Sequence, residues 1–123
     1  MEIVRIEHIE TGVGIFRSRD KNQNNHGTEL PNGLFNDILN RFNNFPSPYN
    51  DGALGYVDYD EYCAFKTVNQ LNKWITKDEI KEFFKIGFRV YLLTVDRCKV
   101  GDKQVIYKKD HVMNKKDITD LFL

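Results

Sequence analysis

The stretch FKTVNQLNKWITKDEIKEFFKIGFRVYLLTV, Phe65–Val95, decides the fold class of this chain. Thr67 stands three residues before Gln70, which is the spacing of a capping box, where a hydroxyl and a later side chain satisfy free N–H groups at a helix start. Thr76 and Glu79 repeat the pattern. Two short helices are therefore expected to begin at these positions. The β-branched and aromatic residues that follow predict a strand, so helices and strands mix within one segment.

Three more segments have the composition of strands: 1–8, 62–66 and 103–109. The last of these is expected to pair with 88–95 as a hairpin across the turn formed by residues 97–102. Segment 34–45 has apolar residues at i, i+4 and i+8, and this spacing predicts an amphipathic helix.

Two polar segments, near 19–33 and 46–60, are expected to be exposed loops because they carry too few apolar residues to bury themselves. The expected order is strand, long loop, helix, loop, strand, two helices, hairpin and tail. No regular strand–helix–strand repeat runs through it. The sequence thus predicts one α+β domain over residues 1–123, with a mixed or mainly antiparallel sheet and three to four short helices.

The apolar positions of these elements define a predicted core. Its members are Ile3, Val4, Ile38, Leu39, Phe65, Leu71, Trp74, Phe83, Phe84, Val90, Leu92, Val95 and Ile106. Gly87 is expected to end the second helix in a left-handed conformation. Asp117 is expected to cap one last helical turn, which returns Ile118, Leu121 and Phe122 to the core.

Composition restricts the classes of function. Lys+Arg and Asp+Glu are 18 each, so no global field attracts nucleic acid, and direct nucleic-acid binding is not expected. No apolar run approaches the roughly 18 residues of a membrane span, and the chain opens without a secretory leader, so a cytoplasmic protein is expected. Between Lys99 and Lys116 there are six lysines against two aspartates, interpreted as a solvated face.

The common catalytic and metal-binding motifs are absent from the sequence. There is no phosphate-binding GxxxxGK[ST] or GxGxxG loop, no HExxH, no CxxC and no GxSxG. Cys63 and Cys98 lie 35 positions apart and are expected to be reduced, buried thiols. No catalytic residue, metal site or tightly bound cofactor is predicted. High Asn, Lys and Ile usage is typical of AT-rich genomes, including those of low-GC bacteria and their phages, and a small phage protein is expected.

The order of elements resembles the ADP-ribosyltransferase family, whose members bind NAD in the cleft of a split sheet. Arg17 in GIFRS, Thr67 in AFKT and Gln104 in KQVIY stand in the order of that family's arginine, Ser/Thr and glutamate. The resemblance covers about three-quarters of the chain by element order. Gln104 takes the place of the glutamate and carries no charge to stabilise an oxocarbenium-like transition state, so binding is expected to survive where catalysis does not.

The resemblance implies a pocket for NAD, ADP-ribose or a related signalling nucleotide, which a phage protein would sequester to counter host defence. The implied ligand-binding residues are Arg17, Ser18, Arg19, Tyr56, Thr67 and Gln104. The two arginines suit a pyrophosphate because a guanidinium fork matches phosphate geometry. An active transferase is a third and less favoured interpretation.

A second hypothesis is a protein-binding inhibitor. Acidic and tyrosine residues alternate in the segment 49–62 and would mimic phosphates and stacked bases, so the partner would be a host protein with a basic, nucleic-acid-binding cleft. The partner-binding residues would be Asp51, Tyr56, Asp58, Tyr59, Asp60 and Glu61. The sequence leaves both hypotheses open.

Overall fold

The computed structural model describes residues 1–12, 14, 60–102 and 104–123. Its elements in chain order are β1 (Glu2–His8), β2 (Glu61–Phe65), α2 (Val68–Trp74), α3 (Lys77–Lys85), β3 (Phe88–Val95), β4 (Lys99–Val100), β5 (Gln104–Lys108), the 3₁₀ turn η4 (Lys109–His111), β6 (Val112–Asp117) and the 3₁₀ turn η5 (Thr119–Phe122). These elements form a single small α+β domain, as predicted.

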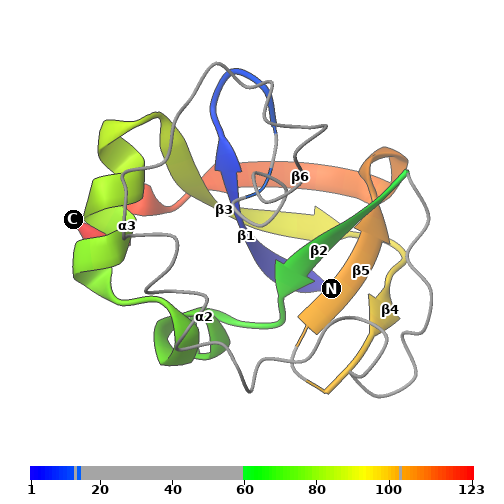
Figure 1. Ribbon diagram of the computed structural model, residues 1–123. Helices are drawn as coiled ribbons and strands as arrows, with labels where there is room; N and C mark the ends of the chain where they lie inside the picture. The colour runs from blue at the N-terminus through cyan, green and yellow to red at the C-terminus, as the bar shows by residue number, and fades with distance from the viewer. Residues whose placement is uncertain (13, 15–59, 103) are drawn as a thin grey trace.

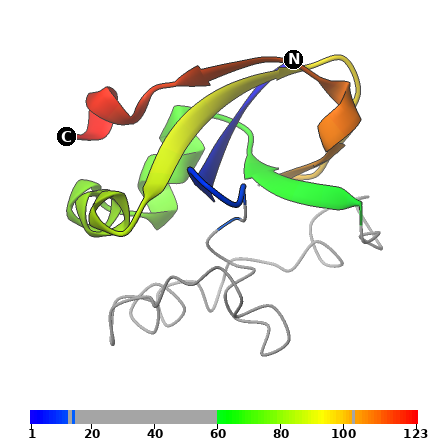
Figure 2. The same ribbon diagram turned by 90° about the horizontal axis from the view of Figure 1, so that it is seen from above.

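The six strands form one sheet in the order β4-β5-β2-β1-β3-β6, and every described pair is antiparallel. This confirms the expectation of a mainly antiparallel sheet. Figure 1 shows α2 and α3 gathered on one side of the molecule, with β4 and β5 on the other. In the view from above, β3 and β6 run beside each other along the sheet (Figure 2).

The strand β1 lies in the middle of the sheet, and all six of its residues from Ile3 to His8 are buried. Val4 and Ile6 pack with residues of both helices in the main core. Ile3 points to the other face, into a second cluster formed by β2, β3 and β5. Because side chains alternate along a strand, Arg5 and Glu7 are held on the same face as Ile3. Polar residues on this strand are therefore buried rather than solvated.

Local capping explains where the helices begin and end. Thr76 and Glu79 form the predicted capping box, with each side chain accepting a hydrogen bond from the other residue's backbone N–H. The Thr67 hydroxyl accepts from Gln70 N at 3.0 Å. Gly87 has φ of +99°, which confirms the left-handed end of α3.

The predicted pairing of 88–95 with 103–109 is wrong. Instead, β3 pairs with β1 along its whole length and with β6 on its other side, while β5 pairs with β2 and β4. The turn that precedes β5 is shorter and lies later in the chain than predicted. Residues 99–100 already form the strand β4, and Gly101 N donates a hydrogen bond to Gln104 O at 2.9 Å. The strand β6 was not predicted.

Most of the predicted core is confirmed. Buried members are Ile3, Val4, Phe65, Leu71, Phe83, Val90, Val95 and Ile106, whereas Trp74, Phe84 and Leu92 are half-buried. Ile118 and Phe122 return to the core as expected, but Leu121 is 65% exposed. Asp117 accepts from Thr119 N at 2.9 Å and so holds the last turn.

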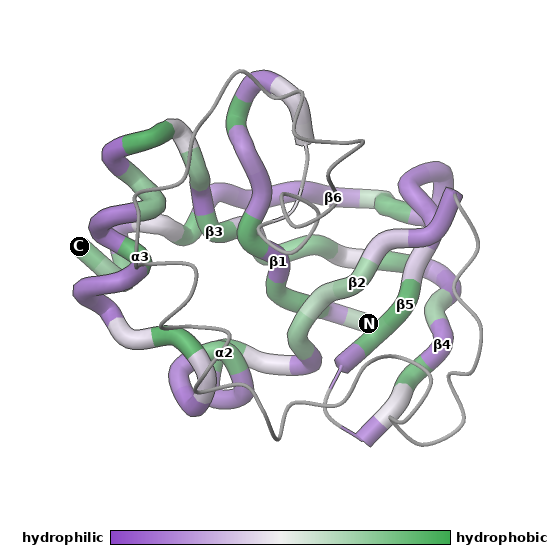
Figure 3. Tube along the Cα trace, viewed as in Figure 1, coloured by the Kyte–Doolittle hydropathy of each residue, from purple (hydrophilic) through white to green (hydrophobic). Residues whose placement is uncertain are grey.

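Several expectations fall on residues outside those described. These are the helix over 34–45 with Ile38 and Leu39, the loop 19–33, and the loop 46–60 except its last residue. Figure 3 shows apolar residues along the central parts of β1, β2, β3 and β5, with hydrophilic residues toward the turns and the outer strand β6.

The substitution Gly87→Ala should destabilise the fold by about 3 kcal/mol, because the left-handed φ and a close contact act together. A Cβ at this position would lie 2.6 Å from His8 Nε2. Gly12 is a matched control, since its φ is +72° but no atom lies within 4 Å of an added Cβ. Gly12→Ala should cost only about 1 kcal/mol. Urea unfolding measures both, and equal losses would contradict the assigned His8 contact.

Candidate functional site

The site begins at the seam between β1 and β2. Within the described ladder these strands share a single register pair, Val4 with Phe65. Next to that pair, Arg5 Nη1 donates a hydrogen bond of 2.7 Å to the carbonyl of Cys63. A side chain thus adds a cross-strand connection beside the one described register pair.

The Arg5 guanidinium is almost fully engaged by neighbouring groups. Its Nε donates to Glu7 Oε2 at 2.8 Å, and its Nη2 donates to the Gly12 carbonyl at 3.2 Å. The rings of Tyr62 and Tyr107 lie 5.1 and 5.9 Å from its central carbon, within the range of a cation–π contact. Arg5 is only 5% exposed. Its charge is therefore held in place and compensated by Glu7.

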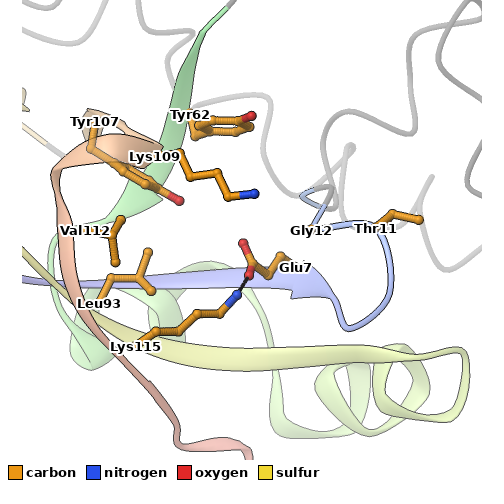
Figure 4. Close-up of a pocket in the computed structure, with 9 residues that line it drawn as sticks. All are labelled: Glu7, Thr11, Gly12, Tyr62, Leu93, Tyr107, Lys109, Val112 and Lys115. Atoms are coloured by element: carbon orange, nitrogen blue, oxygen red, sulfur yellow. Dashed lines mark hydrogen bonds and ion pairs between the residues drawn. The ribbon is translucent and has the colours of Figure 1, made fainter.

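A cavity of about 270 Å³ lies over this network. It is lined by Glu7, Thr11, Gly12, Tyr62, Leu93, Tyr107, Lys109, Val112 and Lys115. Figure 4 shows Lys109 and Lys115 reaching toward Glu7 from opposite sides, with both tyrosine rings on the same wall. Lys115 Nζ forms an ion pair with Glu7 Oε1 and lies 4.1 Å from the Tyr91 ring centroid. These residues come from β1 and the turn that follows it, and from β2, β3, β5, η4 and β6.

The cavity carries an excess of positive charge. Among the described residues, Lys109 and Lys115 line the cavity, the buried Arg5 guanidinium lies beneath it, and Glu7 is the carboxylate that faces them, so these four groups together carry a net charge of +2. Burial raises the pKa of the Tyr107 hydroxyl, with the Arg5 charge acting in the opposite direction. The hydroxyl is therefore neutral at physiological pH and is a hydrogen-bond donor as well as an acceptor. An anion with hydrogen-bonding groups would be stabilised here.

Comparison with protein-family models matches residues 1–120 to the family described as the bacteriophage T4 Y00F protein. The chain belongs to this family. The match covers nearly the whole chain and supports the expectation of a small phage protein. Comparison with curated proteins and with solved structures gave no match. Family membership thus indicates a phage protein, and the site itself carries the information about its chemistry.

Two of the ligand-binding residues expected from the resemblance are described. Thr67 is the N-cap of α2, and Gln104 opens β5 opposite Phe65 with 4% of its surface exposed. Gln104 pairs with Phe65 on the β5 side of β2, two residues before Thr67, and neither Thr67 nor Gln104 is among the residues that line the cavity. Arg17, Ser18, Arg19 and Tyr56 lie outside the described residues.

The acidic segment of the second hypothesis is described only at its end. Asp60 forms an ion pair with Lys108 at 3.5 Å, and Glu61 pairs with Lys99 at 3.2 Å. Glu61 is 3% exposed, so its carboxylate is not on the surface. Asp51, Tyr56, Asp58 and Tyr59 lie outside the described residues.

Sequence reasoning missed the residues of this cavity. Lys109 and Lys115 belong to the lysine-rich stretch interpreted as a solvated face. The described lysines of that stretch are exposed, which confirms the interpretation, and these two also line the cavity. Arg5 and Glu7 were assigned only to a strand. The sequence does contain one signal for this pair. Arg5 and Glu7 carry opposite charges two residues apart on a strand whose other residues are mostly apolar, and this spacing places both side chains on one face.

In residues 1–12, 14, 60–102 and 104–123, no group of three His, Cys, Asp or Glu side chains is arranged to hold a metal ion. Nor is any helix in this part of the chain long and apolar enough to cross a membrane.

Replacing the Arg5 guanidinium tests its structural role. Arg5→Lys keeps the charge but cannot reach Glu7, Cys63 and Gly12 together, so it should destabilise the fold by about 3 kcal/mol. Arg97→Lys, at an exposed position, is the matched control and should change stability by less than about 0.5 kcal/mol. Equal unfolding midpoints in urea for the two variants would show that the seam does not depend on Arg5.

The raised pKa of Tyr107 predicts an alkaline stability loss. The folded state favours the neutral hydroxyl, so this group contributes fully to the free energy of unfolding below the ordinary tyrosine pKa of about 10. Above that pH its contribution falls by up to about 1.4 kcal/mol per pH unit. Tyr107→Phe should lose less stability than the parent between about pH 9 and 11. Urea unfolding at both pH values measures this, and identical losses would contradict the assigned burial effect.

Proposed function

We propose that the chain binds a small anionic ligand of the nucleotide class in the cavity above Arg5. The observation that carries the proposal is the combination of two lysines, Lys109 and Lys115, with two tyrosine walls around one cavity. Lysines supply charge for a phosphate, and aromatic rings supply stacking surface for a base. A cavity for a purely apolar ligand would not need this excess charge.

The lysines rather than Arg5 are the groups that would contact a phosphate. Arg5 is committed to Glu7, Cys63 and Gly12 and is shielded from solvent. Lys115 has a side chain 45% exposed, so its ammonium can keep the Glu7 contact and still face a ligand. Since an ammonium has three donors, both contacts can be made together.

The tyrosine wall fits a planar ring. The centroids of Tyr62 and Tyr107 lie 5.9 Å apart with their planes tilted by 36°, so the two rings pack against each other and leave no room for a base between them. Because Tyr107 is only 4% exposed, a base would stack mainly on the less buried ring of Tyr62 at the cavity wall. The cavity volume of about 270 Å³ is slightly below the roughly 300–1,000 Å³ of typical small-molecule pockets. This size suits one nucleotide unit, so NAD or ADP-ribose would enter with one half of the molecule.

Binding without turnover is the activity that we propose for this phage-family chain. Sequestration of NAD, ADP-ribose or a related nucleotide would remove a host defence signal, in line with the interpretation from the ADP-ribosyltransferase resemblance. The cavity residues support this binding, whereas Thr67 and Gln104 do not line the cavity. The protein-binding alternative has less support, since Glu61 is buried and Asp60 is paired with Lys108.

Calorimetric titration with AMP, ADP-ribose and NAD tests the proposal. Lys109→Ala and Lys115→Ala should each weaken binding roughly tenfold or more, because a charge-assisted contact to phosphate is worth about 1.5–3 kcal/mol. Lys116→Ala is the matched control. Lys116 is exposed, and its register partner Leu92 on β3 packs on the helix-covered core rather than at the cavity. This substitution should leave the affinity unchanged.

The result that would overturn the proposal is an absence of saturable binding for all three nucleotides. Equal weakening by Lys116→Ala and by the two cavity substitutions would also contradict it, because binding would then reflect diffuse charge. Raising the salt concentration should weaken binding to the parent protein, as expected for partly screened lysine–phosphate contacts.

A further inference from the structure

Glu7 is an unexpected group in a cavity that we assign to an anion. Its carboxylate lines the cavity beside the two lysines, and the side chain is only 8% exposed. Figure 4 shows it between Lys109 and Lys115, with one oxygen joined to Lys115. A carboxylate repels a phosphate, so Glu7 must face a different part of the ligand.

The carboxylate has acceptor capacity beyond its described partners. Among the described residues, Arg5 Nε donates to Oε2 and Lys115 Nζ contacts Oε1. An ionised carboxylate offers about four acceptor positions on its two oxygens. Two cations already compensate its charge, so a further positive group on the ligand is not needed. Neutral hydroxyl donors fit the remaining positions better.

We propose that Glu7 accepts hydrogen bonds from the ribose hydroxyls of the bound nucleotide and makes the cavity selective for ribonucleotides over deoxyribonucleotides. This inference rests on the proposed nucleotide binding. In this arrangement the sugar would face Glu7, the phosphate would contact one of the two lysines that flank it, and the base would lie on the side of the tyrosines. A carboxylate is well suited to this task because it accepts without donating, and a sugar hydroxyl can donate to it.

Selectivity follows from the cost of an unmade hydrogen bond. A deoxyribonucleotide would displace water from the buried carboxylate without replacing the lost donor. The ribonucleotide should therefore bind roughly 10- to 100-fold more tightly than the deoxy analogue, the range expected for a hydrogen bond to a charged group. Stacking and phosphate contacts would be the same for both ligands.

The experiment compares AMP, 2′-deoxy-AMP and 3′-deoxy-AMP in calorimetric titrations of the unsubstituted protein. AMP should bind roughly 10- to 100-fold more tightly than at least one deoxy analogue. Because no substitution is involved, the comparison does not depend on whether a variant folds. Equal affinities for all three would overturn the role of Glu7 and leave the proposed nucleotide binding intact. Failure of every nucleotide to bind would overturn both.

Two variants locate the selectivity. Glu7→Gln should reduce the ratio between AMP and the discriminated analogue at least threefold, because a neutral amide oxygen is a weaker acceptor than a carboxylate. Lys115→Ala should weaken the binding of both ligands but preserve most of their ratio. An unchanged ratio in a folded Glu7→Gln protein would contradict the assignment. If that variant does not fold, the three-ligand comparison with the parent protein decides.

Discussion

The buried Arg5 guanidinium is the interaction on which the rest of the structure depends. The sheet consists of two halves, β4-β5-β2 and β1-β3-β6, that meet along the seam between β1 and β2. The contacts across this seam include one register pair, the hydrogen bond from Arg5 to the Cys63 carbonyl and the contact of Arg5 with the Tyr62 ring. Burying such a charge is costly unless it is paired and hydrogen-bonded, and Glu7 supplies the partner. The same pair forms the base of the cavity, so folding and the candidate site share one set of contacts.

The sequence predicts those parts of the fold whose signals are local. The helices α2 and α3 begin at threonine caps and α3 ends at Gly87, because capping geometry needs only neighbouring residues. Strand pairing depends on distant residues, and the assumed hairpin was wrong because β1 is the long partner of β3. The strand β6, Val112–Asp117, carries two lysines and an asparagine, so its strand character comes from pairing with β3 rather than from propensity.

The cavity could not be predicted in the same way. Arg5 and Glu7 alternate with apolar residues, and alternation alone normally places charges on a solvated face. Here both faces of β1 are covered, which only the position of β1 in the sheet reveals. Lys109 and Lys115 belong to a lysine-rich segment whose surface interpretation was reasonable, and only the turn η4 and the register of β6 bring them together. A nearly neutral chain can therefore contain a locally cationic site.

The most direct test of the account is an NMR titration of isotope-labelled protein with AMP, which locates the ligand as well as detecting it. Nucleotide binding in the cavity should give saturable shifts at the side chains of Lys109 and Lys115 and at the rings of Tyr62 and Tyr107. Residues outside the cavity, such as Gln104 at the start of β5, should shift little. Saturable shifts centred on Gln104, or no saturable shift at the cavity residues, would contradict it.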